Sequence, residues 1–68
     1  MTFHIQQKYL AAGEDPHVLT VIGVDDAYGN IYMKRDDSGL TIRVEKRRLE
    51  GMVKRTIMTL LNPKHKEA

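Results

Sequence analysis

Residues 47–61 carry apolar side chains at the spacing of one helix face. Intervals of three and four residues place six positions along one stripe, and these are Leu49, Met52, Val53, Thr56, Ile57 and Leu60. Four cations fall on the opposite side with only Gly51 and Met58 among them, and these are Arg47, Arg48, Lys54 and Arg55. The pattern predicts an amphipathic helix over 47–61 that packs inward and exposes positive charge, although an ordinary solvated helix face has the same pattern.

Three strands are predicted upstream of this helix, between residues 18 and 45. The first is rich in β-branched residues and is expected to be largely buried. In the third, Leu40, Ile42 and Val44 alternate with polar residues, so one face should pack inward and the other should face water. The strands cover 18–24, 31–35 and 40–45, and turn residues cover 25–30 and 36–39. Turns this short favour antiparallel pairing.

Residues 2–12 fit two interpretations. Phe3, Ile5 and Tyr9 alternate as in a strand, whereas the residues from Gln6 to Ala12 are mostly good helix formers. We favour a strand. The helix alternative stays open because Gln7 interrupts the alternation.

The predicted fold class is therefore α+β. It is a small antiparallel meander of three or four strands, with the C-terminal amphipathic helix packed on one face. We expect a single domain over residues 1–62. Pro63 cannot continue the helix, so residues 63–68 are expected to form a disordered basic tail.

The chain is short and has no cysteine. Its 68 residues can bury only a small core, and the absence of cysteine excludes disulfides and thiolate metal sites. A small core without disulfides or a structural metal favours a homo-oligomer, and a homodimer is the simplest form. A reducing cytoplasm suits a chain without cysteine. The longest nearly apolar run, 18–24, is too short to cross a bilayer, and the polar N-terminus does not resemble a signal peptide, so neither membrane insertion nor secretion is expected.

The formal net charge of +2 conceals an asymmetry. Residues 1–42 hold three basic and six acidic side chains, whereas residues 43–68 hold eight basic and three acidic ones, so the two parts carry −3 and +5. The positive part could attract a polyanion that the whole-chain charge would not suggest.

The second predicted strand adds an aromatic side chain to these cations. If Ile31 and Met33 face the core, Tyr32 and Lys34 point outward, beside Arg43 of the neighbouring strand. A tyrosine among cations on an exposed sheet can stack a nucleobase while the cations bind phosphates. The alternative is that Tyr32 is a cross-strand partner that shields the hairpin.

Other chemistry is not indicated. His4, His17 and His65 lack the spacing of metal ligands, so no metal is expected. No glycine-rich phosphate loop and no nucleophile with a plausible base are present, so no cofactor and no catalysis are expected. Gly51 lies within the predicted basic face, where the missing side chain would let another backbone approach, although simple tolerance of glycine also explains it.

Part of the sequence resembles the carbon storage regulator family. The resemblance lies in Leu19-Thr20-Val21-Ile22-Gly23-Val24, in Gly29-Asn30-Ile31, in Ile42-Arg43-Val44-Glu45-Lys46 and in Leu49. It implies a small dimeric RNA-binding regulator of translation, with a β-rich fold whose strands exchange between subunits. It also implies that Lys46 contacts RNA. Gln7-Lys8 stands where the family has paired arginines.

These observations predict a small cytoplasmic regulator that binds nucleic acid, with RNA ahead of DNA. The residues expected to make contact are Tyr32, Lys34, Arg43, Lys46, Arg47, Arg48, Lys54 and Arg55. The alternative is a protein-binding inhibitor or adaptor of the phage or mobile-element type. It would block a host machine by using the same basic face on an acidic or nucleic-acid-binding surface. An enzyme assembled at an oligomer interface stays open, because one chain does not reveal a composite site.

Overall fold

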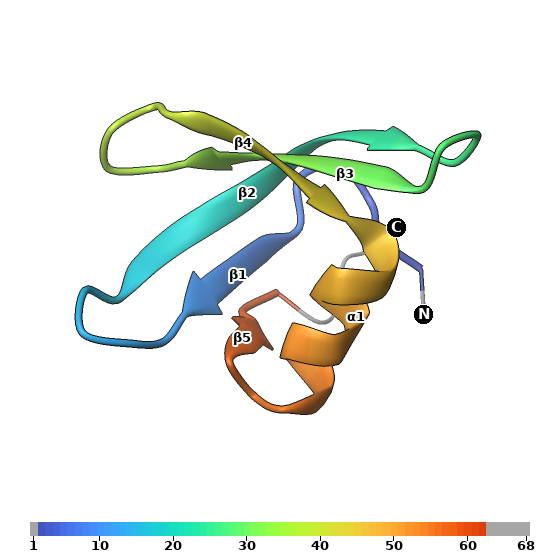
Figure 1. Ribbon diagram of the computed structural model, residues 1–68. Helices are drawn as coiled ribbons and strands as arrows, with labels where there is room; N and C mark the ends of the chain where they lie inside the picture. The colour runs from blue at the N-terminus through green and yellow to red at the C-terminus, as the bar shows by residue number, and fades with distance from the viewer. Residues whose placement is uncertain (1, 63–68) are drawn as a thin grey trace.

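The chain folds into a five-stranded antiparallel sheet with one helix packed against it, as a computed structural model shows (Figure 1). The structure describes residues 2–62, so the predicted tail over 63–68 lies outside the described residues. The elements are β1 (Lys8–Ala11), β2 (His17–Asp25), β3 (Asn30–Arg35), β4 (Thr41–Glu45), α1 (Lys46–Lys54) and β5 (Met58–Leu60). The strand order is β4-β3-β2-β1-β5. The predicted α+β class and antiparallel meander are confirmed, and the ambiguous N-terminal segment supplies β1; the sheet has five strands where three or four were predicted, because β5 adds to the edge at β1.

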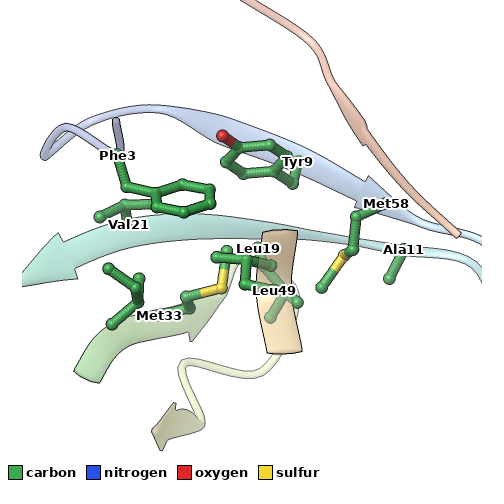
Figure 2. Close-up of a cluster of buried hydrophobic side chains, with 9 residues drawn as sticks. Phe3, Tyr9, Ala11, Leu19, Val21, Met33, Leu49 and Met58 are labelled. Carbon is green, nitrogen blue, oxygen red and sulfur yellow. The ribbon is translucent and has the colours of Figure 1, made fainter. Parts of the chain in front are cut away.

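Side chains that alternate along the strands form a single core (Figure 2). β2 contributes Leu19 and Val21, and β3 contributes Ile31 and Met33, as their alternation predicts. Leu49 of α1 is fully buried among them. The complete set of buried apolar residues is Phe3, Tyr9, Ala11, Leu19, Val21, Ile31, Met33, Leu49 and Met58. Leu49 therefore anchors the helix to the sheet, and Met52 and Val53 of α1 pack partly buried against the same core.

The N-terminal residues fold back over the core before β1 begins. Phe3 is buried, and its ring centroid lies 6.1 Å from that of Tyr9. The side-chain oxygen of Gln7 accepts a hydrogen bond from the His4 N–H at 2.8 Å, so this buried amide is satisfied. Gln6 has a φ of 82°, and the Gln7 N–H donates to the His4 carbonyl at 3.2 Å, so the chain turns here, with Ile5 exposed. The strand is therefore shorter than the alternation from Phe3 suggested.

The predicted helix over 47–61 is wrong in its C-terminal half, because α1 ends at Lys54. Thr56 adopts a left-handed backbone with a φ of 57°. Its N–H donates to the Val53 carbonyl at 3.1 Å, and the Ile57 N–H donates to the Met52 carbonyl at 2.9 Å. This pair of bonds is the Schellman arrangement that closes a helix. Glycine is the usual residue at its left-handed position, so threonine concealed the helix end in the sequence.

The residues after this turn pair as a strand and not as helix. β5 is antiparallel to β1, with Met58 opposite Ala11 and Leu60 opposite Tyr9. Met58, placed on the outer helix face by the helical pattern, is buried at 5% exposure. Ile57, placed on the core stripe, is 42% exposed. Alternate residues point to opposite faces of a strand, so the change of period exchanges their environments.

The apolar face of β4 lies at the edge of the sheet. Ile42 pairs with Met33 and Val44 pairs with Ile31, so β4 has the predicted orientation. Ile42 is nevertheless 36% exposed, because β4 has a strand on only one side, and Leu40, which the sequence placed in this strand, precedes β4 and is 61% exposed. Across residues 2–62, no helix has the length and apolar character needed to span a membrane.

Candidate nucleic-acid interface

Three of the predicted binding residues lie on the face of the sheet opposite the core. Tyr32 pairs with Arg43 across β3 and β4, and Lys34 pairs with Thr41 two residues away on the same face. A bulge in β2 at Ile22 places Gly23 opposite Tyr32. Lys34 and Arg43 are exposed, whereas Tyr32 is half-buried.

The half-burial of Tyr32 has a local cause. A Cβ added to Gly23 would lie 3.4 Å from Tyr32 Cδ2 and 3.5 Å from Tyr32 Cβ. The Tyr32 side chain therefore packs against the backbone of Gly23. The tyrosine shields this part of the sheet, as the cross-strand alternative expected, and its ring is still partly open to solvent.

The remaining predicted residues lie on or just after α1. Lys46, Arg47 and Arg48 form its first turn, Lys54 is its last residue, and Arg55 caps it. The first turn contains no acidic residue, and the preceding Glu45 makes no side-chain capping bond. Positive charge at a helix N-terminus opposes the helix dipole, so this arrangement does not serve helix stability.

Surface hollows bring these cations into two groups beside the helix. Arg48 shares a groove with Arg43 of β4, and Glu45 and Met52 also line it. This groove joins the sheet-face residues to the helix. Arg47, Glu50 and Lys54 line a second hollow around Gly51. A Cβ on Gly51 would meet no described atom within 4 Å beyond the neighbouring helix backbone, so the fold does not require glycine here.

Ion pairing divides the cations of residues 2–62 into two sets. Lys8 pairs with Asp36 at 2.9 Å, and Arg35 pairs with Asp15 at 2.8 Å and with Asp37 at 2.7 Å. The other seven cations make no ion pair within the described part of the chain, and these are Lys34, Arg43, Lys46, Arg47, Arg48, Lys54 and Arg55. They are the seven cations that the sequence predicts as contacts.

The paired cations have a structural role at the start of the β3–β4 turn. The Thr20 hydroxyl donates to Asp36 Oδ1 at 2.6 Å, and Lys8 Nζ donates to Thr20 Oγ1 at 2.8 Å and to Asp36 Oδ2. The Thr20 hydroxyl, and after it Lys8, lower the pKa of Asp36. The Arg35 guanidinium lowers the pKa of Asp37, and hydrogen bonds to Asp37 and then Asp15 raise the pKa of Arg35. These contacts link β1, β2 and β3. The charges of Lys8 and Arg35 are therefore already compensated by carboxylates of the protein.

The structure also adds a residue that the sequence pattern does not single out. Tyr28 is 82% exposed and lines a groove with Lys46 and Arg47 at the end of the β2–β3 turn. The sequence feature that could have identified Tyr28 is an aromatic side chain in a turn of otherwise small and polar residues. This feature is not specific for a binding site, because a turn that only connects two strands can also carry an exposed tyrosine.

A metal site is not formed by the described residues. Within 2–62, no group of three or more histidine, cysteine, aspartate or glutamate side chains could hold a metal ion. His65 lies outside this range.

Comparisons with protein-family models, with curated proteins and with solved structures found no match. The resemblance to the carbon storage regulator family therefore stays a prediction from the residues that carry it.

Proposed function

We propose that this protein binds nucleic acid through the seven cations that make no ion pair within residues 2–62. The contrast with Lys8 and Arg35 carries the proposal, since those two cations have carboxylate partners and the seven have none among the described residues. Phosphate groups would supply the ion-pair partners that these cations lack within residues 2–62. Neutralising phosphates also releases the counterions condensed on the nucleic acid, which favours binding.

The position of the cations suits a backbone that passes over α1. Arg47 and Lys54 are seven residues apart, which corresponds to about 10 Å along a helix. Gly51 lies between them, and the hollow at this glycine lets a phosphodiester backbone come close to the helix. Arg43 and Arg48 provide a second pair across the groove beside β4.

The proposal extends to the biological role. We propose a regulatory protein without catalytic activity that acts in the cytoplasm as a homo-oligomer. The ranking of RNA ahead of DNA rests on the family resemblance, in which Lys46 is the matching contact residue. The absence of cysteine suits a reducing compartment.

The salt dependence of binding tests the proposal. Affinity for a mixed RNA or DNA pool should fall linearly with salt on logarithmic axes, with about 0.7 to 0.9 of slope for each phosphate contact. Replacing Arg47 and Lys54 by alanine should reduce the slope by about 1 to 2. Both side chains are exposed, so circular dichroism and the melting temperature should change little.

A matched control distinguishes the effect of these particular cations on binding from the effect of the net charge. The double variant Lys8→Gln and Arg35→Gln removes the same two charges, but from cations that are already paired. Its slope should stay close to that of the original protein. An equal reduction in both double variants would show that net charge, and not this surface, governs binding. No binding to any nucleic acid at low salt would refute the proposal and would favour the inhibitor or adaptor alternative.

A further inference from the structure

The groove beside the β2–β3 turn differs in composition from the cationic hollows on α1. Tyr28 presents the most exposed of the large apolar side chains in residues 2–62, at 82%. The groove that it lines contains two cations and two carboxylates, and these are Lys46, Arg47, Glu45 and Glu50. Its formal charge is balanced, so it is not primarily a phosphate site.

The turn that carries Tyr28 is held against α1. The Lys46 N–H donates to the Gly29 carbonyl at 2.8 Å, and the Tyr28 N–H donates to Asp25 Oδ1 at 3.3 Å. Gly29 has a φ of 68°, which glycine adopts without strain. The exposed ring is therefore attached to a hydrogen-bonded turn and does not belong to a free chain end.

We infer that Tyr28 stacks on an unpaired nucleobase, so that the preferred ligand is a single-stranded segment. The inference rests on the proposed function and specifies its ligand. An exposed aromatic face stacks on any base, and the bases of a duplex are not available for it. Glu45, which lines the groove, can accept hydrogen bonds from base N–H groups, and the lining cations can donate to base carbonyl oxygens.

The groove at Tyr28 adjoins the hollow at Gly51, where the phosphodiester backbone is proposed to pass. Arg47 and Glu50 line both this groove and the hollow at Gly51. A strand whose base lies on Tyr28 can therefore continue past Arg47 towards Lys54, where its next phosphates meet cations. The groove at Tyr28 has balanced formal charge, which suits an uncharged base, and the hollow at Gly51 has a positive excess, which suits the phosphates of the same strand.

Three probes test the inference by fluorescence anisotropy: a single-stranded oligonucleotide, its duplex, and an abasic strand of equal length. The single strand should bind tightest. Tyr28→Leu should weaken its binding roughly 5- to 150-fold, the conversion of about 1–3 kcal/mol of stacking per base. Binding of the abasic strand, which retains only phosphates and sugars, should not change. Leu40→Ala removes another exposed apolar side chain, at 61%, in the β3–β4 connection, which lies at the opposite end of β3 from the β2–β3 turn (Figure 1), and should leave all three affinities unchanged.

Tyr28→Phe provides a second measurement. It keeps the ring, so the affinity for the single strand should be retained. The chain has no tryptophan, so its emission comes from three tyrosines. Quenching of this emission by the single strand should decrease in Tyr28→Phe if Tyr28 is the stacked residue.

The outcomes distinguish this inference from the proposed function. Equal single-strand affinity in Tyr28→Leu and the original protein would overturn the inference. If the Arg47 and Lys54 variants still reduced the salt slope, the nucleic-acid function would stand without it. Equal affinity for the single strand and the abasic strand would also overturn it. A failure of all probes to bind at low salt would overturn the proposed function as well.

Discussion

Gly51→Ala separates the folding and binding requirements of α1. The position lies inside the helix, with Arg47 one turn before it and Lys54 about one turn after it. A Cβ there meets no described atom within 4 Å beyond the neighbouring helix backbone, so the substitution introduces no clash. Alanine is favoured over glycine inside a helix by about 1 kcal/mol. The variant should therefore be more stable than the original protein.

The expected gain is measurable in a chain of 68 residues. About 1 kcal/mol corresponds to a rise of about 4–8 °C in the melting temperature of a domain this small. Thermal denaturation followed by circular dichroism measures it. An unchanged or lower melting temperature would refute the reasoning, because it would show that the fold itself needs glycine at position 51.

The same variant should bind nucleic acid less tightly. The added methyl group stands in the hollow between Arg47 and Lys54, where the phosphodiester backbone is proposed to approach. Gly51→Leu fills more of the hollow and should weaken binding further. Thr56→Gly is the matched control, because it should also stabilise the protein without filling the hollow. Unchanged binding in Gly51→Ala and Gly51→Leu would show that no backbone approaches here.

Four further outcomes are expected from the packing and the charges. Leu49→Ala should lower the free energy of unfolding, measured by urea denaturation, by about 2–5 kcal/mol, whereas Ile57→Ala should lower it by about 1 kcal/mol or less. Equal losses in the two variants would contradict the end assigned to α1. Thr56→Gly should raise the free energy of unfolding by about 0.5–1 kcal/mol. Glycine removes the strain of the left-handed backbone, and its greater freedom in the unfolded state offsets part of this gain. A lower free energy of unfolding would show that Thr56 is not strained. The lowered pKa of Asp36 stabilises the protein above the unfolded-state pKa near 3.8, and this contribution should be lost as the pH falls through the lower folded-state value. Thr20→Val should bring the pKa of Asp36 closer to 3.8 in a carboxylate NMR titration, and no change would contradict the assigned cause. The melting temperature should rise with protein concentration if the chain self-associates, and a concentration-independent melt with monomeric sedimentation would contradict this.

The sequence by itself determined the elements whose pattern is local. β-branched residues in 18–24 and clean alternation in β3 and β4 identified three strands, because a pleated strand exposes alternate residues to the core and to solvent. The helical pattern, the alternation of β3 and β4 and the family resemblance together selected the seven cations that lack ion pairs within residues 2–62. Lys8 and Arg35 lie in the acidic part of the chain, and the fold brings the carboxylates of Asp15, Asp36 and Asp37 to them.

Only the tertiary structure decided that α1 ends at Lys54 and that β5 succeeds it. The apolar positions of 49–60 satisfy a helical period, and the alternation of Met58 and Leu60 also satisfies a strand, so periodicity alone does not distinguish them. Pairing with β1 decides between them, since β1 offers backbone hydrogen-bonding groups on the edge opposite β2. The groove at Tyr28 has the same origin. It exists because a turn and a helix that are 18 residues apart along the chain, from Tyr28 to Lys46, meet through the bond from the Lys46 N–H to Gly29.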